Sequence, residues 1–190
     1  MAVRELFYRL GINTVSVDAI VEAAETNKMT FYRHFKSKDH VIAEYLRGLA
    51  SEGDAVWEAL AADYADDPSK QLEGWLCYVE QIVSSMDERG CALANAAVEL
   101  PPVHEGRSII EAYKARKRDH LVKLFRQAGY LQPEVLADEV FLVFEGARIN
   151  IQCGGRGGPA TRVVATLRAL LASAPRATVT TSGVAPPSSR

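Results

Sequence analysis

Residues 16–38, SVDAIVEAAETNKMTFYRHFKSK, constrain the fold of this chain more than any other stretch, because they predict two short helices joined by a tight turn. The first half carries apolar side chains at positions i, i+3, i+4 and i+7: Val17, Ile20, Val21 and Ala24. This spacing places one apolar stripe along a helix. Ser16 precedes the stripe and can cap the helix, because its hydroxyl can accept a hydrogen bond from a backbone N–H of the first turn. We expect a short supporting helix with one buried side.

The second half predicts a helix that presents a polar face to solvent. Asn27 is the next N-cap residue, and Phe31 and Phe35, at i and i+4, are expected to point their rings inward. The outward positions hold cations, hydrogen-bond donors and, at the margin, a ring: Lys28, Thr30, Arg33, His34 and Tyr32. No carboxylate stands among them, so this face suits the phosphate oxygens and base edges of a nucleic acid.

Ser37 predicts the start of a third helix, which places Lys38 in its first turn. A cation at this position opposes the helix dipole, and Asp39 beside it offsets the effect only in part. An external phosphate explains Lys38 better than a structural role does.

Residues 30–38, TFYRHFKSK, match the pattern T-[LF]-Y-x-H-F-x-[SN]-K at every fixed position, directly after a capped helix of the right period. In these features the chain resembles the DNA-binding domain of TetR-family transcriptional regulators. The resemblance implies that the helix begun by Asn27 is a recognition helix and that Lys38 holds a phosphate from the next helix. The residues expected to contact DNA are Ser16, Lys28, Met29, Thr30, Tyr32, Arg33, His34 and Lys38.

The chain departs from the family pattern at three places. Glu25 stands in the turn where the family usually has glycine, so a residue with a Cβ is expected in a left-handed conformation. Met29 replaces a small residue, which alters how closely the helix approaches a groove. The first helix, expected within residues 1–10 with Gly11 as its C′ residue, is shorter at its start than is usual in the family.

The formal net charge of −2 argues against a protein that coats nucleic acid indiscriminately. The charge is unevenly distributed, since residues 1–47 hold seven Lys and Arg against six Asp and Glu, whereas the remainder holds fifteen against eighteen. A weakly basic head therefore precedes an acidic body. Affinity for DNA has to come from the local placement of side chains and from two copies of the head.

No apolar run approaches the roughly 20 residues that cross a bilayer, and no basic segment followed by an apolar one opens the chain. We expect a cytoplasmic protein without membrane contact. Cys77, Cys91 and Cys153 are widely spaced and lack a CxxC or Cys/His pairing. We therefore expect reduced, mostly buried thiols, and we predict neither a metal site nor a cofactor.

The pattern along the rest of the chain predicts an all-α fold of about nine helices in total. We expect a helix-turn-helix DNA-binding domain at residues 1–47, a larger helical ligand-binding and dimerisation domain at 48–173, and a disordered tail at 174–190. A long helix that links the head to the body is expected at residues 38–66. The basic run at 114–120, KARKRDH, is interpreted as a solvated helix face rather than a second DNA contact. The glycine-rich run at 154–158 lacks a GK[ST] ending and is interpreted as a flexible connector.

The penultimate helix contains the run VFLVF at residues 140–144, which is apolar on every side and needs cover on more than one face. A partner subunit is the simplest cover for the second face. In the resembled family the last two helices pair with their copies as a four-helix dimer interface. The residues assigned to it here are Phe141, Val143, Val163, Val164, Leu167 and Leu171.

Polar and aromatic groups in otherwise buried helices are the candidates for a ligand cavity: Trp57, Trp75, Tyr78, Asn95, Tyr113, Phe144 and Arg148. Core filling is the alternative for each ring. Asn95 and Arg148 are the stronger candidates, because a buried amide or guanidinium requires a partner that a small molecule can supply. Glu145 is the competing partner, since it can satisfy Arg148 internally.

The histidines lack HExxH and Glu-x-x-His spacing and no serine lies in GxSxG, so no enzyme is predicted. By the resemblance we expect a repressor that binds a palindromic double-stranded DNA operator as a homodimer and is released by a small-molecule effector that is at least partly apolar. The alternative is a helical small-molecule-binding protein whose head no longer binds DNA, motivated by Glu25 and the short first helix.

Overall fold

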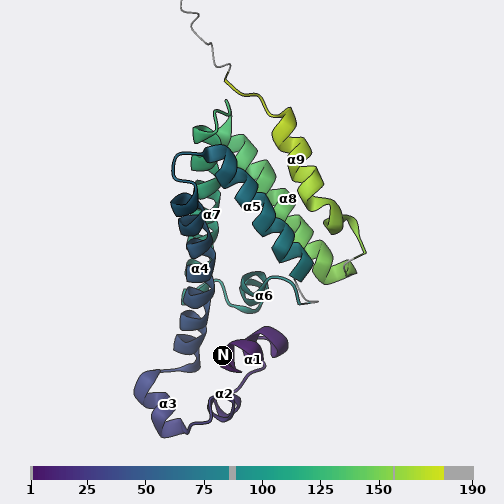
Figure 1. Ribbon diagram of the computed structural model, residues 1–190. Coiled ribbons are helices and arrows are strands. Elements are labelled where there is room, and N and C mark those ends of the chain that lie inside the picture. Colours follow the sequence, from purple (N-terminus) through teal and green to yellow (C-terminus); the bar gives the residue numbers. More distant parts are fainter. Residues whose placement is uncertain (1, 86–88, 156, 178–190) are drawn as a thin grey trace, which may run out of the picture.

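The computed structural model describes residues 2–85, 89–155 and 157–177, and within these ranges the chain is built from helices (Figure 1). The N-terminal helices are α1 (Ala2–Leu10), α2 (Val17–Ala23), α3 (Lys28–His34) and α4 (Lys38–Asp63). The remaining helices are α5 (Pro68–Ser85), α6 (Ala92–Glu99), α7 (Glu105–Gln127), α8 (Pro133–Gly154), the 3₁₀-helix η1 (Pro159–Arg162) and α9 (Val163–Ser173). The predicted all-α fold with a three-helix head is confirmed.

Three predicted N-caps start the helices around the turn. The cap atoms and the amides that donate to them are Ser16 Oγ and Ala19 N at 3.1 Å, Asn27 Oδ1 and Thr30 N at 2.9 Å, and Ser37 Oγ and His40 N at 3.2 Å. Each bond satisfies an N–H group that a helix leaves unpaired at its start. Local chemistry of the sequence therefore determines where α2, α3 and α4 begin.

The long helix α4 joins the head to the body. It packs along α7, which packs in turn along α8, while α5 and α9 complete the body (Figure 1). The helix ends at Asp63, three residues before the predicted end at Asp66, because Tyr64 leaves the helical conformation with φ −135° and ψ 47°. A movement of the body against α4 can therefore reach the head through one continuous element.

The buried side chains form two cores that do not follow the predicted domain boundary at residue 47. One core lies wholly in the body, around Trp75, Phe125 and Phe144. The other joins head residues such as Phe7 and Phe31 to residues of α6 and of the first half of α7. The head therefore shares its core with part of the body.

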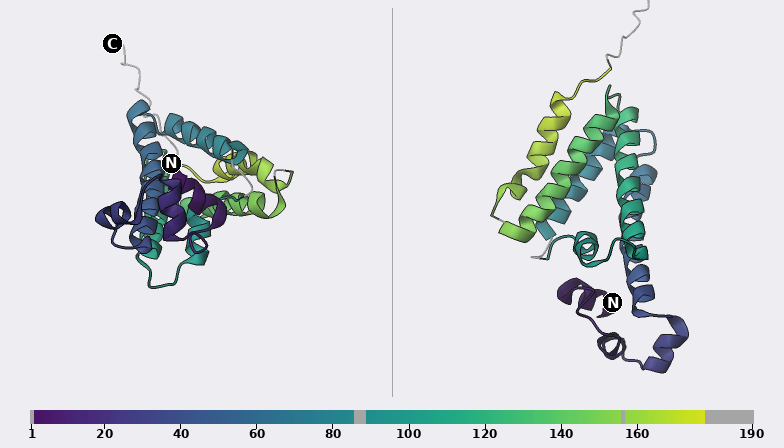
Figure 2. Two further views of the ribbon diagram at one scale, coloured as in Figure 1. Left: turned by 90° about the horizontal axis from the view of Figure 1, so that it is seen from below. Right: turned by 180° about the vertical axis from the view of Figure 1, so that it is seen from behind.

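The first helix is attached to the α6 region by polar contacts as well as by packing. The Tyr8 hydroxyl donates to the Gly90 carbonyl at 3.1 Å, and Arg89 donates to the Arg9 carbonyl at 2.8 Å. In the turn after α1, the Asn13 side chain donates to the Glu99 carbonyl at 2.9 Å. The two ribbon views show α6 crossing between α1 and the ends of the body helices (Figure 2). The head therefore contacts the body through α6 as well as through α4.

The C-terminal prediction requires a correction. Residues 174–177, predicted as part of a disordered tail, pair with the loop before α8: the Leu131 amide donates to Pro175, and the Ala177 amide donates to Gly129. Residues 178–190 lie outside the described residues. The order of the first four residues comes from these backbone bonds and from Arg176 stacking over the Tyr130 ring, neither of which a composition count detects.

Two interpretations of side-chain burial were also wrong. Of the three cysteines, Cys91 is buried whereas Cys77 and Cys153 are exposed, because the latter two lie on the outer faces of their helices. The basic run 114–120 is not simply solvated, since Lys117 is only 4% exposed. Among the described residues, no helix is both long and apolar enough to cross a membrane.

Candidate nucleic-acid interface and internal cavity

The outer face of α3 consists of side chains that are exposed to solvent. Lys28, Met29, Tyr32, Arg33 and His34 are exposed, with Met29 at 85% and Tyr32 at 57%. The spacing of residues 28, 29, 32 and 33 places them on one side of the helix. Phe31 is buried beneath them and anchors the helix, as predicted.

The two lysines of this surface have partners within the protein. Lys28 forms an ion pair with Asp18 of α2 at 2.7 Å, and the hydrogen bond that it donates there raises the pKa of the lysine. Lys38 donates to the Asn13 carbonyl at 3.1 Å, so its position in the first turn of α4 has a structural explanation that the sequence did not reveal. Thr30 is half-buried and Ser16, at the start of α2, is exposed. A phosphate at this surface would contact cations that the fold already holds in place.

The turn between α2 and α3 closes without glycine. Glu25 adopts a φ of +50°, the left-handed conformation expected at this position. The Glu25 amide donates to the Glu22 carbonyl at 3.0 Å, and the Thr26 amide donates to the Val21 carbonyl at 2.9 Å. These two bonds form the Schellman arrangement that commonly ends a helix. The helix-turn-helix geometry is therefore retained although Glu25 stands in place of the usual glycine, the feature that suggested a head unable to bind DNA.

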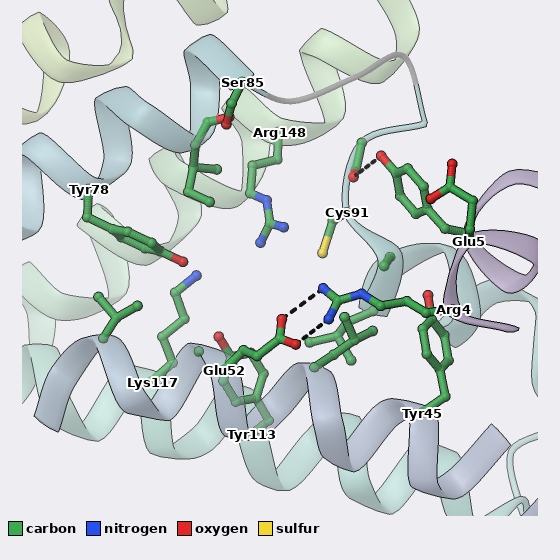
Figure 3. Close-up of a pocket in the computed structure, with 18 residues that line it drawn as sticks. Arg4, Glu5, Tyr45, Glu52, Tyr78, Ser85, Cys91, Tyr113, Lys117 and Arg148 are labelled. Atoms are coloured by element: carbon green, nitrogen blue, oxygen red, sulfur yellow. Dashed lines mark hydrogen bonds and ion pairs between the residues drawn. The ribbon is translucent and has the colours of Figure 1, made fainter. Parts of the chain in front are cut away.

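A cavity of about 540 Å³ lies where the head meets the body. Its walls come from α1, α4, α5, α7 and α8 and from residues 90–93. Figure 3 shows Tyr78, Lys117, Arg148, Cys91 and the Arg4–Glu52 pair around this space. The volume falls within the range of small-molecule pockets, which is roughly 300–1,000 Å³. The cavity touches the first helix of the head directly, because Arg4 and Tyr8 of α1 line it.

One wall of the cavity is backed by a buried group of charges. Lys117 donates to Glu145 at 3.0 Å, Lys114 pairs with the same carboxylate, and Arg148 approaches it only to 3.8 Å. Burial lowers the pKa of Lys117 to about 8, although Glu145 acts in the opposite direction. Burial raises the pKa of Glu145, but the charges of Lys117, Lys114 and Arg148 outweigh burial and bring it down to about 2. Both shifts have the sign expected of a site with more cations than carboxylates.

The phenols of the cavity are un-ionised groups. Burial raises the pKa of Tyr45 to about 12 and also raises the pKa of Tyr78 and of Tyr113. At neutral pH these side chains therefore offer hydroxyl donors and acceptors on apolar rings.

The seven predicted ligand residues separate into three groups. Tyr78, Tyr113 and Arg148 line the cavity. Trp57, Trp75 and Phe144 lie elsewhere, in the body core, where Trp57 stacks between Trp75 and His120 and the Phe144 ring meets the edge of Trp75. Asn95 is also absent from the lining, because its amide donates to Arg89 and accepts from Gln152. Core filling, the alternative for the rings, accounts for these three, because each packs against other body rings.

The predicted dimer residues also divide by burial. Val163, Leu167 and Leu171 are at most 6% exposed within one protomer, so they pack into its own core rather than onto a partner. Phe141, Val143 and Val164 are half-buried, and the Phe141 ring lies 5.6 Å from the amines of Lys114 and Lys117. The large apolar side chains exposed on α8 are Val135 at 52%, Leu142 at 69% and Ile149 at 45%. The apolar stripe of α9 formed by Val163, Leu167 and Leu171 faces α5 and α8, whereas Val164 stays a predicted interface residue.

The sequence interpretation missed several residues of the cavity, notably Arg4, Tyr45, Glu52 and Lys117. The signal for Lys117 was present in the spacing, since it lies four residues from each of the buried side chains Tyr113 and Leu121. No comparable signal marks Arg4, because its place depends on how α1 packs against α4. Among the described residues, no cluster of His, Cys, Asp and Glu could hold a metal ion.

Comparisons with known proteins agree with this geometry. Residues 2–45 match the family model described as bacterial regulatory proteins, tetR family. The chain is 25% identical over 159 residues to the HTH-type transcriptional repressor DhaR from Mycobacterium sp. (strain GP1), covering 78% of this chain and 77% of that protein.

Solved structures extend the likeness from the head to the whole fold. A TetR-family transcriptional regulator from Streptomyces coelicolor superimposes with a TM-score of 0.80 at 24% identity, covering 90% of each chain. A putative TetR-type regulator from Streptomyces avermitilis gives a TM-score of 0.71 at 27% identity, covering 91% of this chain and 93% of that one. The family match of the head, the full-length fold and the sequence signature of α3 thus agree, and together they support a DNA-binding transcriptional regulator of the TetR family.

Proposed function

We propose that the protein is a repressor that binds a palindromic operator as a homodimer and leaves the DNA when a small organic effector fills the cavity. The observation that carries the DNA-contact part is the outer face of α3, where Met29 and Tyr32 stand exposed on a helix anchored by buried Phe31. The fold does not require these apolar and aromatic side chains to be exposed to water. They suit contact with base edges and thymine methyl groups. Ser16, Lys28, Thr30, Arg33, His34 and Lys38 are the proposed contacts to phosphates and bases.

Dimerisation is proposed through the outer surface of α8 together with α9. Leu142 and Ile149 are exposed on α8, and Leu142, Val143, Gly146 and Thr166 line a shallow groove of about 250 Å³ between α8 and α9. A second copy related by a two-fold axis presents the same ridge and groove, so each ridge can enter the groove of the partner. Two recognition helices placed about 34–36 Å apart would then meet successive major grooves.

Effector release is proposed to work through the spacing of the two heads. A ligand in the cavity touches α1 and α4 as well as the body helices, so it can favour an arrangement in which α4 holds the heads at the wrong separation. To act as an inducer it has to bind that arrangement better by a coupling free energy of about 1–3 kcal/mol.

The DNA-contact proposal is tested with an operator selected from random duplex DNA by repeated rounds of binding. A selected site with two-fold symmetry supports the homodimer. Tyr32→Ala should weaken binding to this site by roughly tenfold or more in a mobility-shift titration, because a lost base contact costs about 1–3 kcal/mol.

The matched control is Tyr64→Ala, which removes another exposed tyrosine at the far end of α4. It should bind the operator as the wild type does. Equal affinity of wild type and Tyr32→Ala would contradict the assignment of α3 as the recognition helix.

A further inference from the structure

The charges that line the cavity divide into pairs that neutralise each other and cations that remain in excess. On the side of α1, Arg4 binds Glu52 through two hydrogen bonds, of which that from Nη2 is 2.8 Å long, and Arg9 binds Glu5. Both carboxylates of the lining are therefore already paired with arginines of the head. The opposite wall is different, because Glu145 is a single carboxylate facing three cations.

Among those three cations, Arg148 is the one with the weakest partner. Its Nε is buried and has no hydrogen-bond acceptor among the described residues, and its Nη1 lies 3.8 Å from Glu145. The two lysines take the carboxylate at shorter distances, so Glu145 does not satisfy the arginine as the sequence allowed. A guanidinium nitrogen that is closed off from water and has no acceptor loses hydration without compensation, which is costly unless a ligand supplies the missing oxygen.

The guanidinium of Arg148 also points into the empty space. In Figure 3 it extends from α8 into the space around which Tyr78, Lys117 and the Arg4–Glu52 pair are also arranged. Apart from Ser85, the remaining side chains of the lining are apolar or aromatic and include Leu49, Val56, Ile82, Tyr45 and Tyr113. A ligand that fits has one acidic end and a ring-like or apolar body.

We propose that the effector cavity binds an organic anion, a carboxylate or sulfonate on an apolar or aromatic body, with its acidic group held by Arg148 and its charge shared by Lys117. This inference deepens the proposed function, on which it rests for the assumption that the cavity is the effector site. A guanidinium presents parallel N–H groups that match two oxygens of such an acid, and the contact replaces the acceptors that Arg148 lacks. Burial is the main cause of the lowered pKa of Lys117, and the charges of Arg148 and Lys114 act in the same direction, so an anion in the cavity would offset part of the cost of holding this ammonium there.

The test compares two fluorescent probes that share one ring system. 1-Anilinonaphthalene-8-sulfonate carries an anionic group, whereas N-phenyl-1-naphthylamine is its neutral counterpart. Arg148→Met should weaken binding of the anionic probe by about tenfold or more, because a hydrogen bond to a charged group contributes about 1.5–3 kcal/mol. It should leave the affinity for the neutral probe within about twofold of wild type, since the methionine keeps most of the apolar stem.

The control variant is Arg118→Met, which removes an arginine of α7 that pairs with Asp138 outside the cavity. It should bind both probes as the wild type does. The proposal is overturned if Arg148→Met weakens binding of the anionic probe by less than the expected amount, or if it weakens binding of both probes equally.

A second measurement needs only the wild-type protein and decides the question if Arg148→Met fails to fold. 1-Naphthoate and 1-naphthylmethanol, which differ in the acidic group, each compete with the bound anionic probe. The carboxylate should displace it at a concentration at least about tenfold lower than the alcohol does, for the same energetic reason. Equal competition overturns the anion site.

Operator affinity measured with 1-naphthoate present separates this inference from the proposed function. Charge-selective binding without any loss of operator affinity keeps the anion site and overturns release by the effector. If 1-naphthylmethanol lowers operator affinity as much as 1-naphthoate does, the anion site is overturned and the proposed function is kept.

Discussion

At the scale of single residues, Glu25 is the non-glycine residue that the described part of the chain holds at positive φ. A side chain with a Cβ in the left-handed region costs about 1–2 kcal/mol relative to its preferred conformations, and glycine does not incur this cost. The two backbone hydrogen bonds of the turn are nevertheless formed, so the conformational cost at Glu25 lowers the stability of the folded protein.

Glu25→Gly should therefore raise the free energy of unfolding by about 1 kcal/mol, measured by urea denaturation at a fixed protomer concentration. Glu25→Ala is the matched control, because it removes the same charge but keeps the Cβ. An equal gain in both variants would show that the carboxylate, not the backbone conformation, is responsible.

The buried charge of Lys117 shows that one side chain can change the interpretation of a whole basic run. Residues 114–120 look like a solvated basic face when counted by type. In the fold, Arg116 pairs with Asp54, Arg118 pairs with Asp138, and Lys117 turns inward to Glu145. Composition predicts the charge of such a run, but partners on two other helices, α4 and α8, decide where each charge goes.

At the scale of elements, α4 contains two glycines with different surroundings. A Cβ added at Gly48 would meet no atom within 4 Å, whereas one added at Gly53 would lie 2.0 Å from the Tyr113 hydroxyl oxygen and 2.6 Å from its ring. Gly53 thus permits the Tyr113 ring of α7 to pack directly against the backbone of α4. This close approach places the ring at the cavity wall.

Gly48→Ala should stabilise the protein by about 0.5–1 kcal/mol, because alanine has the higher helix propensity and nothing obstructs it. Gly53→Ala should destabilise it by about 1–3 kcal/mol, because the buried ring has to move. Thermal unfolding followed by circular dichroism measures both. A similar gain at the two positions would mean that the Tyr113 ring does not occupy the space beside Gly53.

The connection between head and body is a second property of the elements. Part of the head's core is built from α6 and α7, and α1 contributes Arg4 and Tyr8 to the cavity. We infer that an occupied cavity acts on the head along two routes, through α1 directly and through α4. The sequence suggested only α4, because the length of that helix was visible in the pattern while the docking of α1 onto α6 was not.

At the scale of the whole molecule, the exposed apolar side chains of α8 belong to a surface that one protomer does not cover. Leu142→Glu combined with Ile149→Glu should convert the proposed dimer to monomers. The two-fold symmetry would bury each new carboxylate without a partner charge in both copies, which destabilises the dimer. Sedimentation velocity reports the assembly state directly.

Val98→Glu is the control for this pair, since Val98 is 86% exposed and belongs to α6, which is not part of the proposed interface. It should leave the assembly unchanged. The double variant should also lose affinity for a symmetric operator, because monomers cannot engage both half-sites together. A dimer that persists in the double variant would place the interface on another face.

The sequence by itself determined the helices, their N-caps and the turn between α2 and α3, because these features depend on residues within a few positions of each other. It also determined the outward face of α3, since the period of a short helix separates Phe31 from Tyr32 without reference to the rest of the fold. For the same reason the helical pattern along the rest of the chain was sufficient to predict the all-α architecture.

Only the tertiary structure decided which buried group faces which. The periodicity of α9 identified an apolar stripe but not whether a partner or α8 covers it, and Trp57 and Trp75 gave no sign that they stack on each other rather than line a cavity. Arg148 became a candidate anchor because Lys117 and Lys114, distant in sequence, take the carboxylate that would otherwise satisfy it. Contacts between helices depend on how the helices cross, and no local pattern in one helix specifies the side chains of another.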